Sequence, residues 1–247
     1  MPKKPLVLIT RTRPAAKKLA DKVAERGFEA WECPPFQLEP PLDPAAVADD
    51  LSTMLPADRV ILTSHEAVRQ AVALVGTEKL GRALLIVPGQ GTAEVARELG
   101  LKDVFYPERH GTSEAMLAMP ELRDVDGLDV LILAAAGGRG LMGRALDRRG
   151  ALVERIHVYR RVPCDLPEGT SERILKAESL AILGASLESV TGLLERLSDE
   201  AAQKVRESPI IVPSQRIATR AVELGCTHCI VAAGASDDFM LKELEHL

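Results

Sequence analysis

The chain has 247 residues, 46% of them hydrophobic, and a formal net charge of -5. This length allows two ordinary hydrophobic cores. We expect no nucleic-acid partner, because phosphate neutralisation needs a concentrated basic face and the sequence has none. The apolar runs are too short for a signal peptide or a membrane span, which predicts a cytoplasmic protein without membrane contact.

Short apolar runs alternate with helical patterns along the whole chain, which is typical of parallel α/β layers. The first helix shows the pattern: Pro14 opens it, Gly27 ends it, and one face is apolar. Most of the strand runs are continuously apolar, as expected of strands that are covered on both faces. We predict ten strands, in chain order at residues 6–10, 28–33, 60–63, 83–87, 104–106, 130–133, 152–159, 180–183, 210–212 and 229–232.

Two proline-rich segments, residues 34–44 and 160–170, interrupt this alternation. Proline cannot continue a helix or a central strand, so we predict that both segments are linkers. A cut into sequential halves near residue 123 remains an alternative, but no comparable linker lies there. The predicted division is a discontinuous first lobe (1–34 plus 168–247), a second lobe (45–158) and two inter-lobe linkers (35–44 and 159–167).

The chain also repeats itself. Residues 86–100 and 211–225 match at nine of fifteen positions without a gap, and residues 7–10 and 60–64 are echoed near 130–133 and 181–186. The offset is close to half the chain, so a domain-sized unit has been duplicated rather than a short solenoid repeat. We expect two similar α/β lobes that face each other across a cleft.

The loops after several strands are rich in small and hydroxyl residues, and each leads into a helix. Helix amino termini carry unpaired N–H groups and partial positive charge, so these loops favour an anionic ligand. Open α/β sheets bind ligands at this end of their strands. An alternative is that Ser64, Thr92 and Ser186 only cap their helices. The candidate ligand-binding residues are Thr10, Arg11, Arg13, Ser64, Gly89, Gln90, Thr92, Gly138, Arg139, Ser186, Ser214 and Gln215.

Two short motifs carry weaker alternatives. The pattern G-x-G-x-x-G at residues 138–143 suggests dinucleotide binding as an alternative. The following strand ends in arginines and has no acidic residue for a ribose hydroxyl, so only NADP would fit. A general anion-binding turn explains these glycines better. Cys226 and Cys229 have the spacing of a redox or metal pair, yet their repeat counterparts Leu101 and Val104 are apolar. We therefore favour buried structural cysteines and expect no metal.

Tyr159 lies at the end of a predicted strand, next to the second linker. A phenol can donate a proton, although a half-buried, hydrogen-bonded tyrosine is the commoner outcome. No nucleophile elbow or metal-binding helix motif is present.

Taken together, six segments resemble the uroporphyrinogen-III synthase family, in order and spacing, over essentially the whole chain. They are residues 8–14, 61–68, 87–93, 111–117, 137–139 with 146–150, and 158–162. The resemblance implies two similar flavodoxin-like or Rossmann-like lobes with parallel sheets, joined by a two-stranded linker. It also implies closure of the linear tetrapyrrole hydroxymethylbilane with inversion of the last ring, through loss of the terminal hydroxyl and a spiro-pyrrolenine intermediate.

By the same resemblance, Tyr159 assists departure of the hydroxyl, and Thr92, Ser64 and Ser186 line the cleft. No metal or organic cofactor is implied, and the substrate brings eight carboxylates. A transient contact with the preceding deaminase is an open alternative. Ile217 and Gly140 depart from the family pattern. The rival hypotheses are a two-lobed small-anion binding protein without catalysis and, more remotely, an NADP-dependent oxidoreductase.

Overall fold

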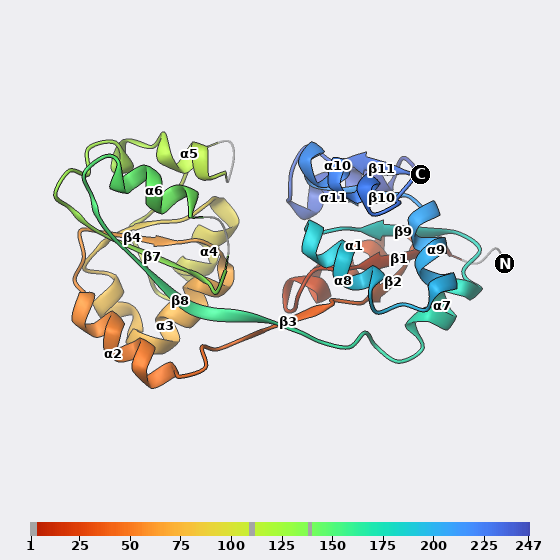
Figure 1. The fold of residues 1–247 in the computed structure, drawn as a ribbon, viewed down its shortest axis with the longest axis horizontal. Helices are drawn as coiled ribbons and strands as arrows, with labels where there is room; N and C mark the ends of the chain where they lie inside the picture. The colour runs from red at the N-terminus through yellow and green to blue at the C-terminus, as the bar shows by residue number, and fades with distance from the viewer. Residues whose placement is uncertain (1–3, 109–111, 138–139) are drawn as a thin grey trace. The chain divides into compact units, whose positions relative to one another are not determined.

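The structure, a computed structural model, describes residues 4–108, 112–137 and 140–247. The chain divides into two compact units, the first from Met1–Gln37 with Val162–Leu247 and the second from Leu38–Arg161 (Figure 1). The chain crosses from one unit to the other within two strands, β3 (Phe36–Glu39) and β8 (Leu152–Pro163).

The first unit contains a five-stranded sheet in the order β11-β10-β9-β1-β2, and its strand pairs are parallel. The central strand β1 aligns Leu8 with Trp31 on one side and with Ile182 on the other. The strands are β1 (Leu6–Ile9), β2 (Glu29–Glu32), β9 (Leu180–Leu183), β10 (Ile210–Val212) and β11 (Cys229–Val231).

Helices cover both faces of this sheet, which explains why β1, β9, β10 and β11 are continuously apolar. The edge strand β2 instead begins and ends with a glutamate. Val7 and Ile9 belong to one core cluster, while Leu6 and Leu8 belong to another, because successive side chains of a strand point to opposite faces. The first cluster includes residues of α1 (Ala15–Glu25) and α11 (Asp237–Leu244). The second includes residues of α7 (Thr170–Lys176), α8 (Leu187–Leu194), α9 (Asp199–Glu207) and α10 (Gln215–Glu223).

The second unit contains a six-stranded sheet in the order β3-β8-β7-β4-β5-β6. One core cluster joins it to α2 (Pro44–Met54), α3 (His65–Leu80) and α4 (Gln90–Glu98). The other joins it to α5 (Ser113–Leu117), a 3₁₀ turn (Pro120–Leu122) and α6 (Leu141–Asp147). The remaining strands are β4 (Arg59–Leu62), β5 (Leu84–Ile86), β6 (Val104–Phe105) and β7 (Asp129–Ala135).

The sequence repeat is also a repeat of strand order. The order β11-β10-β9-β1-β2 in the first unit matches β6-β5-β4-β7-β8 in the second when strands are paired by their repeated sequences. Numbered along the chain, the first unit has the flavodoxin-like order 2-1-3-4-5, whereas the second contains the Rossmann-like order 3-2-1-4-5. The difference arises because the first unit takes its strands from both ends of the chain. The predicted parallel α/β fold is confirmed.

The proline-rich segments are more regular than the sequence suggested. Residues 36–39 form β3, which was not among the predicted strands, and β8 continues to Pro163 instead of ending near residue 159. β3 lies at the edge of its sheet, where proline is tolerated because one side of the strand needs no partner. β3 is the second neighbour of β8, and it can pair with the part of β8 that extends past the end of β7.

Candidate functional site

In both units, helices begin directly after the carboxyl ends of the parallel strands. α3, α4 and α6 follow β4, β5 and β7 in the second unit, and α8, α10 and α1 follow β9, β10 and β1 in the first. Each of these helix termini presents backbone N–H groups and partial positive charge at the end of its sheet. The loops selected from the sequence therefore follow strands at the ends where open α/β sheets bind ligands.

Ser64 and Tyr159 meet at the beginning of α3. Ser64 is the N-cap residue, and its Oγ accepts a hydrogen bond of 3.1 Å from the backbone N–H of Ala67. The Oγ also lies 3.0 Å from the Oη of Tyr159. Tyr159 is only 4% exposed and packs in the core between the sheet and α3. The structure thus joins two of the predicted site residues, which are 95 positions apart in sequence.

A register shift in β8 accompanies the position of this tyrosine. Ala134 pairs with His157, but the next residue, Ala135, pairs with Tyr159. The backbone N–H of Ala136 then donates a 2.9 Å hydrogen bond to the Tyr159 carbonyl. The irregularity changes which residue of β8 stands opposite the end of β7. The sequence gives no signal for this shift.

The first turn of α4 carries three of the predicted residues. Gly89 is the N-cap, and the Gln90 side chain donates to Glu94 at 2.8 Å on the helix surface. Thr92 is 7% exposed. A Cβ atom at Gly91 would lie 3.4 Å from Nε2 of His65, so the His65 side chain lies close against this turn. His65, which was not among the predicted site residues, is the first residue of α3 and thus lies next to the beginning of α4.

In the first unit, the corresponding serine is engaged differently. Ser186 and Ser189 form a capping box, in which each side chain accepts a backbone N–H of the other residue, at 3.1 and 2.9 Å. Thr10 is buried behind them. Its Oγ1 lies 3.0 Å from both the Leu183 carbonyl oxygen and Ser189 Oγ, and accepts the backbone N–H of Ala185 at 3.0 Å. The hydrogen bonds of the Thr10 hydroxyl thus go to other groups of the protein.

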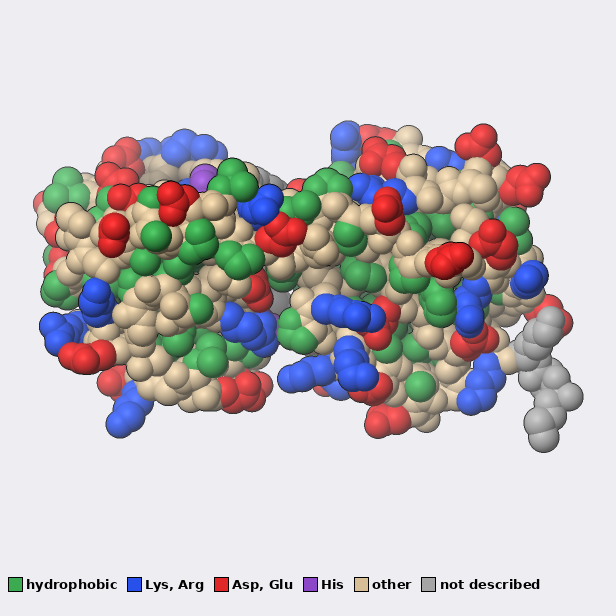
Figure 2. Space-filling model, turned by 90° about the horizontal axis from the view of Figure 1, so that it is seen from below, with side chains coloured by type: hydrophobic (Ala, Val, Ile, Leu, Met, Phe, Trp, Pro, Cys, Tyr) green, Lys and Arg blue, Asp and Glu red, His purple; other side chains and the backbone are tan. Residues whose placement is uncertain are grey.

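The two predicted arginines of the first unit form ion pairs with carboxylates of the same unit. Arg11 contacts Asp237 at 2.6 Å and the Ala235 carbonyl at 2.6 Å, while Arg13 contacts Glu32 at 2.9 Å. Figure 2 likewise shows cationic and anionic side chains near one another on both units over the face in view. To bind either arginine, a ligand carboxylate would have to displace Asp237 or Glu32 from it.

The remaining predicted positions differ in how much the structure says of them. Ser214 is the N-cap of α10, but its side chain makes no capping hydrogen bond, and Gln215 is exposed. Gly138 and Arg139 lie outside the described residues. Next to them, Nη2 of Arg155 donates a 2.6 Å hydrogen bond to the Gly137 carbonyl. Arg155 was not predicted from the sequence.

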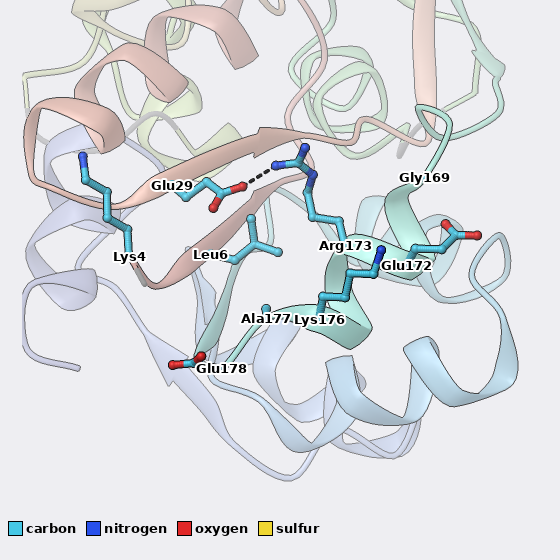
Figure 3. A pocket seen from close by; sticks show the side chains of 9 residues that line it. All are labelled: Lys4, Leu6, Glu29, Gly169, Glu172, Arg173, Lys176, Ala177 and Glu178. Atoms are coloured by element: carbon cyan, nitrogen blue, oxygen red, sulfur yellow. Dashed lines mark hydrogen bonds and ion pairs between the residues drawn. The ribbon is translucent and has the colours of Figure 1, made fainter. Parts of the chain in front are cut away.

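A pocket of about 440 Å³ lies elsewhere in the first unit, at the end of the sheet where β1 and β2 begin (Figure 3). Arg173 contributes to it while it pairs with Glu29 and stacks over the Trp31 ring at 4.0 Å. Its three cationic side chains are matched by three carboxylates, so its charge favours no anion. The lining residues are Lys4, Leu6, Glu29, Gly169, Glu172, Arg173, Lys176, Ala177 and Glu178, none of them predicted.

The four cysteines are free thiols. Cys226 is buried, and Cys229 packs against the same core cluster. Burial raises the pKa of the Cys226 thiol to about 11, so it carries little thiolate. Within residues 4–108, 112–137 and 140–247, no group of three or more potential ligands could hold a metal ion. No helix in these same ranges has the length and apolar character that a membrane crossing requires.

Comparison with known proteins gives one family. A sequence model described as uroporphyrinogen-III synthase HemD matches residues 17–242. The chain is 31% identical to the uroporphyrinogen-III synthase of Salmonella typhimurium (97% of this chain, 99% of that one) and 28% identical to that of Escherichia coli, with the same coverage. Its fold is similar to crystal structures of uroporphyrinogen-III synthetase from Helicobacter pylori (TM-score 0.64, 15% identity) and of a mutant uroporphyrinogen III synthase from Thermus thermophilus (TM-score 0.60, 23% identity), each covering 98% of both chains.

Proposed function

Because the chain belongs to the uroporphyrinogen-III synthase family, we propose that it converts hydroxymethylbilane to uroporphyrinogen III, with release of one water and inversion of the last ring. The observation that carries the proposal is the match to a named synthase over almost the full length of both chains. The enzyme class is a cyclising lyase. The two rival hypotheses, an anion-binding protein and an NADP-dependent oxidoreductase, have no comparable support.

The amide-lined strand ends support an acidic substrate. Hydroxymethylbilane carries eight carboxylates, and several helix termini can accept carboxylates even in a chain with a net charge of -5. We assign substrate binding to the first turns of α3, α4, α6, α8 and α10, through Ser64, Gly89, Gln90, Thr92, Gly138, Arg139, Ser186, Ser214 and Gln215. Arg11 and Arg13 contribute by releasing their carboxylate partners and binding substrate carboxylates instead. Thr10 contributes by shaping the loop before α8.

Tyr159 supplies the proton for departure of the terminal hydroxyl. Its support is the position of the phenol oxygen, which lies 3.0 Å from the N-cap hydroxyl of α3 at the end of the sheet. Positioned acids contribute about 10²- to 10⁴-fold, and restriction of a flexible chain to one reactive geometry contributes further. The substrate cyclises unaided, so the shape of the site decides which isomer forms.

Two finer proposals follow from the same assignment. The proposed substrate, hydroxymethylbilane, is a soluble molecule with eight carboxylates, so we place the protein in the cytoplasm. Its substrate is an unstable product of the preceding deaminase, and a transient contact between the two enzymes would limit spontaneous closure. Co-sedimentation of the purified pair with and without substrate would test that contact.

The test of the activity is product isomer analysis. The purified protein, treated with a chelator, is mixed with freshly generated hydroxymethylbilane, and the products are oxidised and separated. We expect mainly the type III isomer, because spontaneous closure without inversion gives type I. Heat-denatured protein is the control. Type I product alone, formed in the presence of stoichiometric folded protein, would contradict the proposed function.

A further inference from the structure

The two hydroxyls at the beginning of α3 differ in their access to a ligand. Tyr159 is 4% exposed and lies within the hydrophobic core, whereas Ser64 is half-buried at the N-cap. Their oxygens are 3.0 Å apart. A substrate at the carboxyl end of β4 therefore meets the serine before it meets the phenol.

Counting donors and acceptors gives the serine a definite role. A serine hydroxyl has one proton and two lone pairs. One lone pair of Ser64 accepts the Ala67 N–H at 3.1 Å. When Tyr159 donates to the second lone pair, both acceptor sites are used, and the serine proton is left for a third partner.

We infer that Ser64 and Tyr159 form a proton relay in which Ser64 donates to the departing hydroxyl of the substrate and is reprotonated by Tyr159. This inference rests on the proposed function. The Ser64 O–H bond breaks as its proton moves to the leaving oxygen, the carbon–oxygen bond breaks, and water departs. The Tyr159 proton moves to Ser64 and leaves a phenolate. The proton that the last pyrrole ring releases on ring closure returns along the same path, so the enzyme is restored.

The surroundings stabilise the charge that this relay creates. After the transfer, the Ser64 hydroxyl can donate back to the phenolate oxygen, and hydrogen bonds to charged groups are stronger than neutral ones. The phenolate would also lie beside the amino terminus of α3, which is helical from His65 to a kink at Gly76 and whose partial positive charge favours an anion.

The first unit offers no second relay among its described residues. Ser186 occupies the corresponding N-cap, but its side chain accepts the backbone N–H of Ser189, and the Ser189 hydroxyl lies against Ser186 and Thr10. No tyrosine is present in this unit, since Tyr106 and Tyr159 both belong to the second. Both serines therefore cap their helices, but only Ser64 also lies beside a tyrosine hydroxyl.

The test separates proton transfer from helix capping. Asparagine ranks with serine as an N-cap but has no hydroxyl, so Ser64→Asn keeps the cap and breaks the relay. Ser64→Thr keeps both. We expect Ser64→Asn and Tyr159→Phe each to lower kcat for type III formation by about 10²- to 10⁴-fold. The double variant should be no slower than the slower single variant, and Ser64→Thr should stay within about tenfold of the native enzyme.

Ser198→Ala is the matched control, because it removes an N-cap serine from α9 that takes no part in the site. Its effect on kcat should be small and should add to that of Tyr159→Phe. Additive losses for Ser64→Asn and Tyr159→Phe, or native kcat in either, would overturn the relay. If the native protein itself gives no type III product, the proposed function fails instead, so the two failures are distinguishable.

Discussion

Thr10 and Leu183 join the carboxyl ends of two central strands, with the threonine Oγ1 3.0 Å from the leucine carbonyl oxygen. The second unit repeats the contact with the roles exchanged between strands. There Thr63, at the end of β4, donates to the Leu133 carbonyl of β7 at 3.0 Å. The duplicated units thus preserve a hydrogen bond at the same place in the sheet without preserving which strand supplies the threonine.

The first prediction is that Thr10→Val affects stability more than substrate binding. The valine leaves the Ala185 N–H, which now donates to Thr10 Oγ1, without its partner. An unsatisfied group of this kind costs about 1–3 kcal/mol in the free energy of unfolding. Urea unfolding would measure this loss, and KM should stay within about threefold. Thr63→Val should cost less, because no backbone N–H of the described residues donates to the Thr63 hydroxyl. A large rise in KM with native stability would instead assign the Thr10 hydroxyl to the substrate.

The second prediction concerns Thr92 and its repeat counterpart Ile217. Both side chains are almost buried in the first turn of their helices, at 7% and 6% exposure. Isoleucine is therefore compatible with this position, and Thr92→Ile should still fold, at a cost of about 1–3 kcal/mol in the free energy of unfolding, because the side chain is larger. It should raise KM and let type I product appear, because an apolar group replaces the hydroxyl at a terminus that we propose receives a substrate carboxylate.

Isomer ratios at saturating substrate would check this prediction. Ile217→Thr provides the reciprocal control and should keep the type III product. Unchanged selectivity in Thr92→Ile would show that this terminus does not shape the substrate.

Local sequence patterns predicted most of the fold because the strands are strongly apolar and the helices have clear ends. The structure contains a strand at each of the ten predicted places. β3 escaped prediction because its four residues, with Phe36 and Leu38 among them, form a strand only by pairing with β8. Such pairing depends on residues more than 100 positions away, which local patterns do not report.

The candidate site was less accessible to sequence reasoning. The loops could be selected because hydroxyl and glycine residues precede helices. Sequence patterns could not show which of these hydroxyls already form hydrogen bonds within the protein, since the contact of Thr10 with Ser189 spans 179 positions. The capping box in α8 uses serine in place of the usual acidic partner, so its sequence signature is weak. Arg155 was missed because its contact with Gly137 depends on the alignment of β7 and β8.

The third prediction uses the buried thiol of Cys33. Burial raises its pKa from 9.0 to about 12, although a backbone hydrogen bond from Ile9 partly opposes this. The unfolded chain releases the thiol proton from about pH 9, whereas the folded protein retains it to about pH 12. The stabilising contribution is therefore complete below pH 9 and is lost as the pH rises from 9 to 12, by up to about 1.4 kcal/mol per pH unit.

Urea unfolding of native protein and Cys33→Ala at pH 8, 9.5 and 10.5 would measure this loss. The stability advantage of the native protein over the variant should shrink as the pH rises, because only the native chain carries this thiol. Subtracting one protein from the other removes the contribution of the other cysteines. An advantage that does not change with pH would show that Cys33 titrates alike in the folded and unfolded chains.

The last prediction compares two glycines inside helices. A Cβ atom at Gly192 in α8 would lie 2.9 Å from Cβ of Pro35 and 3.2 Å from Cε2 of Phe36, in the segment that leads into β3. At Gly143 in α6, the nearest atoms would lie at 3.8 Å, which is ordinary contact. Alanine stabilises a helix by about 0.5–1 kcal/mol relative to glycine, whereas overpacking costs about 1–3 kcal/mol.

Gly143→Ala should therefore raise Tm by about 1–4 °C, while Gly192→Ala should lower it despite the same gain in helix propensity. Differential scanning calorimetry would give both values under identical conditions. Because Pro35 and Phe36 lie where the chain leaves the first unit, Gly192→Ala should also increase proteolysis near residues 34–44. A higher Tm in both variants would mean that the linker segment moves aside at no cost, and that the close approach to α8 does not fix its position.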